Sequence, residues 1–269
     1  MTALQAIVLA IVQGLTEFLP VSSSAHLILL PRLLGWPDQG QVFDLATHLG
    51  SLLAVLVYFR RELLDVLAAT PKLFSRQALV PGNDSSLLFN LAIGTIPAAI
   101  AGLLIADFVA GRARDPFLIA CTTLVYGVLL GLADWLGRGT RDEHHVSWPQ
   151  ALLIGVFQAL ALVPGTSRSG ATITAGRFTG LSRPGAARFS FLLSVPVGFL
   201  VAAKETIDLL HGEGARLGTL PLVLGFVVSA LTSFAVIAWF LRWLQRRSLM
   251  VFVGYRLVLA VLLFVWFAR

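Results

Sequence analysis

The sequence predicts an all-α polytopic membrane protein, with six transmembrane helices and two re-entrant helical hairpins in inverted-topology repeats. The first observation is composition: of 269 residues, 57% are hydrophobic and 13% are charged, against about 25% charged residues in a soluble domain. The others are six long apolar runs and two apolar segments that are broken near their middle. A membrane span needs about 20 apolar residues, so the chain is expected to form one integral membrane domain, residues 1–269.

Six apolar runs are long enough to be read as complete membrane spans. Short polar loops separate them, and the longest loop, Arg60–Ser86, contains an amphipathic piece, Glu62–Leu67, that is expected at the membrane interface. The six runs are Phe43–Phe59, Leu87–Val109, Phe117–Leu136, Ala187–Ala203, Thr219–Leu241 and Leu249–Ala268.

The two broken segments are predicted to be re-entrant hairpins. Ala3–Leu34 is interrupted at Pro20–Ser24, and Trp148–Leu181 is interrupted at Pro164–Ser169. Each half is too short to cross a bilayer, and proline and glycine end a helix. Non-helical backbone at membrane depth persists only where it is buried in protein or lines a watery cavity, so both interruptions are expected to face a shared interior site.

The two halves of the chain form a weak internal repeat, the first about 1–136 and the second about 148–269. Each half begins with a broken hairpin, and each later has a span with a proline in its middle, Pro97 and Pro196. Repeats of this kind are common in membrane proteins whose binding site lies near the midplane.

Loop charges predict the orientation, because cytoplasmic loops carry an excess of Lys and Arg. If each hairpin returns to the side it entered, one side of the membrane holds nine basic residues, in the loops Arg60–Ser86, Gly137–Ser147 and Arg242–Ser248. The opposite side holds five, which are Arg112, Arg114, Lys204, Arg216 and Arg269. The richer side is predicted to be cytoplasmic, so both termini and the opening of the first hairpin face outward.

The first hairpin carries a carboxylate in an apolar helix. Gln13 and Glu17 are four residues apart and therefore share one helical face. An ionisable residue within a membrane segment indicates a functional site by default, and oxygen ligands suit a hard divalent cation such as Mg²⁺ or Ca²⁺. Gln13 and Glu17 are the candidate metal ligands, and a structural ion pair at Glu17 is the alternative.

Three hydroxyls and a histidine follow this carboxylate. Ser22, Ser23 and Ser24 occupy the break, and His26 comes two residues later. A lone histidine in apolar sequence is commonly a satisfied core residue, but next to Glu17 and the serines an acid–base role is favoured. Ser23 is the candidate nucleophile with His26 moving its proton, and direct attack by His26 is left open.

The second hairpin has the chemistry of an anion cradle. Arg168 presents a planar fork that matches phosphate oxygens, and a helix that starts near Gly170 would add free N–H groups and a positive dipole end. Ser22 and Ser24 are expected to join this shell from the first hairpin. The hydroxyl donors of the second hairpin are Thr166, Ser167, Ser169 and Thr172. Together the hairpins predict a ligand that is anionic at one end and apolar at the other.

The strings Gln13–His26 and Pro164–Thr172 resemble the two signature motifs of the bacterial undecaprenyl-diphosphate phosphatases of the bacitracin-resistance-protein type. The resemblance extends along nearly the whole chain and implies six spans with two re-entrant hairpins. It also implies hydrolysis of undecaprenyl pyrophosphate to the monophosphate, dependent on a divalent metal, at the outer face of the bacterial inner membrane. That activity recycles the lipid carrier for peptidoglycan synthesis and confers bacitracin resistance.

A lipid-carrier flippase with the same phosphate site is the main alternative, because broken helices in inverted repeats are typical of transporters. Nucleic acid is not an expected partner, since the net charge of +6 is scattered between apolar runs. Gly127-x-x-x-Gly131 permits close helix packing or a homodimer face. Asp44 and His48 are as consistent with a structural hydrogen bond as with the site, and Arg256 is read as paired or snorkelling.

Overall fold

The computed structural model describes residues 1–110, 115–210 and 218–267, and these residues are helical nearly throughout. Eleven α-helices follow one another in the described part of the chain, joined by short loops and three 3₁₀ turns, Thr70–Lys72, Arg76–Leu79 and Glu143–His145. The helices are α1 (Ala3–Thr16), α2 (Ser23–Leu34), α3 (Gln41–Tyr58), α4 (Arg60–Ala68), α5 (Asp84–Ala110), α6 (Pro116–Leu136), α7 (Trp148–Leu160), α8 (Arg168–Phe178), α9 (Arg183–Leu210), α10 (Thr219–Leu244) and α11 (Met250–Phe267). The all-α prediction is confirmed.

Five of the described helices, α3, α5, α6, α9 and α10, are long and apolar enough to cross a membrane. Each coincides with one of the apolar runs predicted from sequence. The sixth run forms α11, which belongs with the shorter apolar helices α1, α2 and α7. Many apolar side chains on the long helices are exposed, for example Leu103 and Leu231. This exposure fits a lipid environment, because a soluble protein rarely leaves so much contiguous apolar surface uncovered.

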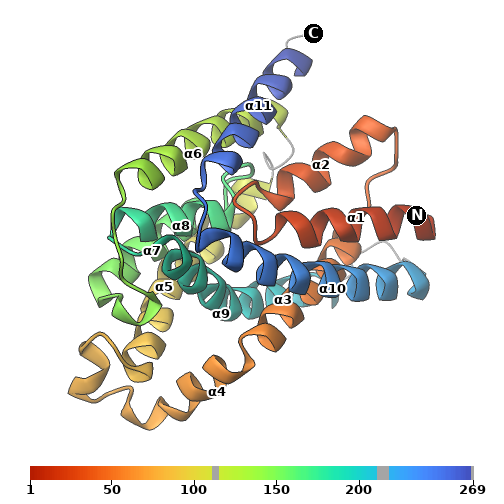
Figure 1. Cartoon of the computed structure of the whole chain (residues 1–269). Coiled ribbons are helices and arrows are strands. Elements are labelled where there is room, and N and C mark those ends of the chain that lie inside the picture. Colours follow the sequence, from red (N-terminus) through yellow and green to blue (C-terminus); the bar gives the residue numbers. More distant parts are fainter. Residues whose placement is uncertain (111–114, 211–217, 268–269) are drawn as a thin grey trace.

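Two pairs of short helices, α1 with α2 and α7 with α8, lie on opposite sides of the molecule in Figure 1 and point their connecting turns toward the middle. The first connecting turn lies between Thr16 and Ser23, and the second lies between Leu160 and Arg168. In the same view, the start of α1 and the end of α11 both lie away from α4. Of the basic residues predicted for the outer side, Arg112, Arg114, Arg216 and Arg269 lie outside the described residues.

Each hairpin packs against a long helix of the other half of the chain. α1 lies along α10, and α7 lies along α5. Glycines permit both approaches: a Cβ on Gly14 would come within 2.6 Å of the Thr232 side chain, and one on Gly155 would come within 2.4 Å of the Gly94 carbonyl. The two halves are therefore interlocked, which holds the two turns at a fixed separation.

Partly buried ion pairs stabilise the end of the molecule near α4. Arg183 contacts the fully buried carboxylate of Asp134 at 2.5 Å, which joins α9 to α6. Arg188 of α9 bonds Glu62 of α4 at 2.8 Å and also bonds Glu143 of the third 3₁₀ turn. These pairs fix the start of α9, the helix that forms one wall of the site.

Candidate active site

The two connecting turns have the same backbone geometry. Ser22 is the N-cap of α2 with φ 74°, and Ser167 is the N-cap of α8 with φ 70°. They are the only non-glycine residues with positive φ in the described ranges, and an L-residue in this region is strained. Each is followed by a serine two positions on, with hydroxyl separations of 3.2 Å to Ser24 and 3.3 Å to Ser169. Strained, hydroxyl-rich turns that meet inside the protein are typical of functional sites.

An ion pair joins the two hairpins. Arg168 Nη2 donates to Glu17 Oε1 at 2.9 Å, and both side chains are largely buried. The other oxygen of Glu17, Oε2, accepts from Ser23 Oγ at 2.8 Å and from Gln13 Nε2 at 3.0 Å. Arg168 Nη1 is buried without a hydrogen-bond partner among the described residues. The guanidinium therefore keeps a free donor for a further anion.

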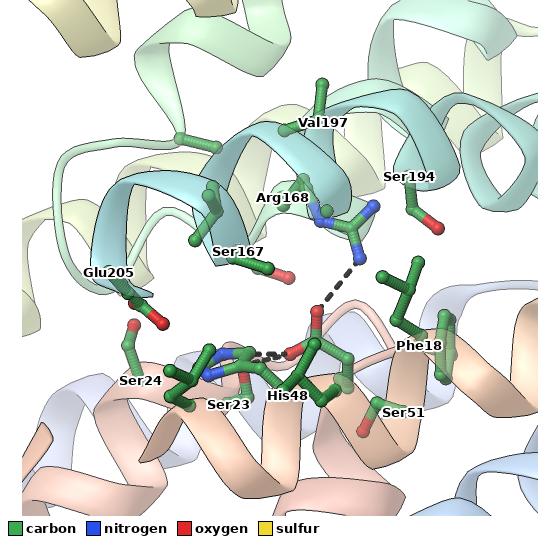
Figure 2. A pocket seen from close by; sticks show the side chains of 18 of the residues that line it. Phe18, Ser23, Ser24, His48, Ser51, Ser167, Arg168, Ser194, Val197 and Glu205 are labelled. Carbon is green, nitrogen blue, oxygen red and sulfur yellow. Dashed lines mark hydrogen bonds and ion pairs between the residues drawn. The ribbon is translucent and has the colours of Figure 1, made fainter. Parts of the chain in front are cut away.

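A cavity of about 200 Å³ opens at this ion pair. Figure 2 shows Arg168 and Ser167 facing Ser23 and His48 across it. Glu17, Ser22 and Ser24 also line the cavity. Six residues that sequence reasoning assigned to two distant hairpins thus converge: Glu17, Ser22, Ser23, Ser24, Ser167 and Arg168.

A second cavity, of about 360 Å³, continues from Arg168 between α5, α7 and α9. Its walls are mainly apolar, with Leu103, Leu162 and Leu200 among them, and Arg168 and Val201 line both cavities. A cavity that contains an arginine, a carboxylate and several serines adjoins a mainly apolar one at Arg168. This arrangement matches a ligand with a phosphate head and a hydrocarbon chain, as predicted from sequence.

His26 does not line either cavity. Its Nδ1 lies 2.7 Å from the Ser22 carbonyl, so Nδ1 carries a proton and donates it, and its Nε2 lies 2.5 Å from the Tyr255 hydroxyl. The imidazole is also stacked on the Tyr255 ring. Both ring nitrogens are therefore engaged away from Ser23, which instead donates to Glu17.

Four predicted phosphate ligands lie behind the cavity wall, where they support the turn. Ser169 Oγ donates to the Leu19 carbonyl at 3.0 Å and so connects the two hairpins. Thr172 Oγ1 bonds the Arg168 carbonyl and the Ser190 hydroxyl. The remaining two residues, Thr166 and Gly170, are buried, and Gly170 N donates to Ser167 Oγ.

The donor set fits a divalent cation only in part. The Glu17 carboxylate lies in the cavity and could serve such an ion together with phosphate oxygens of the substrate, since Mg²⁺ commonly uses one or two carboxylates. Gln13 is fully buried and turns its amide nitrogen toward Glu17, so it is placed to orient that carboxylate. No group of three or more His, Cys, Asp or Glu side chains suited to a metal was found in the described ranges.

Sequence reasoning missed or undervalued three residues near the site. His48 Nε2 lies 3.9 Å from Glu17 Oε2, and Glu205 of α9 lines the same cavity. Arg256 is fully buried and bonds both turns. For His48 and Arg256 the available signal was an ionisable residue inside an apolar run, and Glu205 follows the end of such a run by two residues. Sequence did not reveal which runs adjoin the hairpins.

Comparison with known proteins shows the family of this chain. The family model described as bacitracin resistance protein BacA matches residues 6–262. The chain belongs to the bacitracin resistance protein family. It is 52% identical to "Undecaprenyl-diphosphatase 2" of Stutzerimonas stutzeri, covering 100% of this chain and 99% of that protein. It is 49% identical to "Undecaprenyl-diphosphatase" of Nitrosococcus oceani, covering 97% of each chain. Both motifs that converge at the cavity lie within the matched residues of this family.

Proposed function

We propose that this member of the family hydrolyses undecaprenyl pyrophosphate to undecaprenyl phosphate and orthophosphate, the substrate class that the names of its relatives indicate. The observation that carries the proposal is the position of Arg168, which lines both the cavity that holds Glu17 and the serines and the mainly apolar cavity beside it. Such a reaction recycles the lipid carrier for peptidoglycan synthesis and accounts for bacitracin resistance.

Arg168 is proposed to bind the pyrophosphate, with Ser167 beside it. A guanidinium holds phosphate through parallel charge-assisted hydrogen bonds, and Arg168 Nη1 is free for one of them. Glu17 occupies Nη2 in the substrate-free geometry, so an incoming phosphate competes with this carboxylate. Ser22 and Ser24, which also line the cavity, provide further donors.

Ser23 is the proposed nucleophile. Its Oγ would attack the terminal phosphorus, the bond from that phosphorus to the bridging oxygen would break, and undecaprenyl phosphate would leave. The hydroxyl proton already points to Glu17 Oε2 at 2.8 Å, so this oxygen is the nearest acceptor. One water then hydrolyses the phosphoserine, releasing orthophosphate and restoring the serine. His26→Ala tests proton transfer through His26 and direct attack by it.

A divalent cation, Mg²⁺ or Ca²⁺, is proposed to bind at Glu17 and at phosphate oxygens. When bound, it would neutralise negative charge that develops on the transferred phosphoryl group. Gln13 would keep the Glu17 carboxylate oriented toward the cavity through its hydrogen bond.

We further propose that α3, α5, α6, α9, α10 and α11 span the bacterial inner membrane and that the α1–α2 and α7–α8 hairpins are re-entrant. The chain would then be one membrane domain with inverted repeats at about 1–136 and 148–269. The lengths of the five long helices and the opposite placement of the hairpins support this arrangement. The charge of the loops favours a cavity that opens to the periplasmic face.

Phosphate release tests the function directly. Purified protein in detergent is given undecaprenyl pyrophosphate with Mg²⁺ or Ca²⁺, and orthophosphate is measured with and without chelator. We expect release that depends on both the enzyme and the cation. Absence of release under all conditions would contradict the proposal and favour the flippase alternative, because a pure flippase forms no orthophosphate.

A further inference from the structure

Arg256 is a fully buried cation in the middle of α11. Its guanidinium donates to four backbone carbonyls, at 3.2 Å to Thr123, 3.2 Å to Pro20, 2.9 Å to Gly165 and 3.1 Å to Thr166. One acceptor belongs to α6, one to the first connecting turn and two to the second. Arg256 is thus bonded to both turns at once.

Three of the bonded carbonyls lie one or two residues before the two strained serines. Pro20 is two residues before Ser22, and Thr166 immediately precedes Ser167. Fixing these carbonyls restricts the peptide units that hold Ser22 and Ser167 at positive φ. An unfavourable backbone conformation persists only where its surroundings enforce it, and the Arg256 fork provides that restraint for both turns.

Neither snorkelling nor ion pairing accounts for the position of Arg256. Snorkelling requires the guanidinium to reach solvent or headgroups, but Arg256 has no exposed surface. The salt bridges found among the described residues do not include Arg256. Its polar contacts are with carbonyl oxygens, for which the planar five-donor guanidinium is better suited than an ammonium group.

The glycine motif of α6 explains how Arg256 approaches this position. A Cβ on Gly127 would lie 3.1 Å from the Arg256 Cβ, and one on Gly131 would lie 3.2 Å from Val253. The Gly127-x-x-x-Gly131 motif therefore packs against α11 within the chain. This close contact places the Arg256 side chain between α6 and the two turns.

We propose that Arg256 is a positioning residue that holds the two hairpin turns in register, and with them Ser23 and Glu17 opposite Arg168. The proposal rests on the phosphatase function for its kinetic consequence. Its structural consequence, the fixed separation of the hairpins, is measurable without any substrate.

Substitution of Arg256 tests the kinetic consequence. Arg256→Met removes all donors, and because displacement of catalytic groups by about 1 Å costs on the order of 100-fold, we expect kcat per folded enzyme to fall by about that factor. Arg256→Lys keeps the charge and some donors, and we expect a smaller loss, about 10-fold. A value of kcat within about threefold of the unmodified protein in Arg256→Met would overturn the proposal.

Arg177 provides a matched control. It is also a buried arginine that donates to carbonyls, those of Leu181 and Gly137, but it lies at the far end of α8 and lines neither cavity. We expect Arg177→Met to lower the melting temperature while kcat per folded enzyme stays within about threefold. An equal loss of kcat in both variants would show that Arg256 acts only through general stability.

A distance measurement separates positioning from stability. Leu15 on α1 and Leu160 on α7 are 42% and 46% exposed, so each can carry a spin label as cysteine in a Cys121→Ser background. We expect dipolar spectroscopy to show a broader distance distribution in Arg256→Met and an unchanged one in Arg177→Met. An unchanged distribution in Arg256→Met would overturn the proposal. A broadened one in a protein that releases no phosphate would support it and contradict only the proposed function.

Gly127→Ala tests the same contact if Arg256→Met does not fold. The added methyl group would press on the Arg256 Cβ at 3.1 Å, and we expect kcat to fall severalfold with a broader distance distribution. Gly254→Ala on α11 is its control, since a Cβ there meets nothing within 4 Å. Equal kcat values and equal distance distributions in Gly127→Ala and Gly254→Ala would contradict the proposal.

Discussion

Glu17 Oε1 lies 2.9 Å from Arg168 Nη2, although 151 residues separate the two in sequence. In this arrangement the carboxylate occupies the position at the arginine where a substrate phosphate would bind. Binding of a pyrophosphate to Arg168 would release Glu17 Oε1 toward a cation, while Oε2 already accepts from Ser23. In the substrate-free protein the ion pair therefore neutralises two buried charges, each of which would destabilise the fold if left unpaired. It also joins the first hairpin to the proposed phosphate site.

Glu17→Ala is expected to abolish turnover. The change removes the acceptor for Ser23 and the cation-binding carboxylate, and loss of such a group costs roughly 100-fold or more. Orthophosphate release with the cation present is the measurement. Gln13→Ala is the matched comparison and should lose less, because Gln13 only donates to Glu17 from outside the cavity. Near-normal activity of Glu17→Ala would mean that the first hairpin is not the catalytic centre.

Arg168→Lys should be severely impaired although the protein still inserts and folds. Lysine keeps the charge but lacks the planar fork that grips phosphate at two points. Negative charge develops on the phosphoryl oxygens as the bond breaks, so kcat should fall as well as substrate affinity. Steady-state kinetics in detergent measure both. Full activity of Arg168→Lys would mean that the second motif serves only as a helix cap.

Ser23→Ala and His26→Ala distinguish the two candidate nucleophiles. Ser23 lines the cavity and donates to Glu17, whereas His26 is held by the Ser22 carbonyl and Tyr255. We expect Ser23→Ala to lose more activity than His26→Ala in single-turnover assays. Tyr255→Phe, which removes the contact at Nε2, tests whether His26 depends on that hydroxyl. Full activity of Ser23→Ala would exclude Ser23 as nucleophile and favour attack by His26.

Reporter fusions test the orientation. A reporter joined after Arg269 should indicate the periplasm, and one inserted in the Arg60–Ser86 loop should indicate the cytoplasm, since the richer basic loops lie on that side. Phosphatase and fluorescence reporters give complementary signals. The opposite pattern would contradict the charge count and place the cavity on the wrong face for recycling the carrier outside the cell.

Arg188→Gln should destabilise the end of the molecule near α4. The change breaks contacts to Glu62 and to the buried Glu143, and the unpaired acceptors cost about 1–3 kcal/mol. Hydrogen bonding to Arg188 lowers the pKa of Glu62. The Arg188–Glu62 pair therefore stabilises the folded protein at pH values above the ordinary carboxyl range, and this stabilisation is lost as pH falls through the lowered pKa. The melting temperatures of the unmodified protein and of Arg188→Gln, measured from pH 7 to 3, test this prediction. An equal pH dependence of the two melting temperatures would contradict it.

The apolar runs and the two breaks could be predicted from sequence because they depend on local chemistry. A run such as Thr219–Leu241 is apolar whatever surrounds it, and the structure places α10 at Thr219–Leu244. The convergence of Glu17 with Arg168 could be expected as well, since charge in a broken apolar helix requires an interior partner. The last run differs from the others, because α11 is shorter and contacts the two hairpins through the polar side chains of Tyr255 and Arg256.

The direction of individual side chains was decided only by tertiary packing. Ser169, Thr172 and Ser167 carry similar hydroxyls in one motif, yet among them only Ser167 lines the cavity, because the pitch of α8 turns the others toward Leu19 and α9. His26 was favoured for its neighbours in sequence, but helix α2 turns it to Tyr255. Sequence determined which residues are chemically suited to a membrane phosphate site. Only the interlocked helices decided which of them meet, because contacts such as that between Glu17 and Arg168 join residues 151 positions apart.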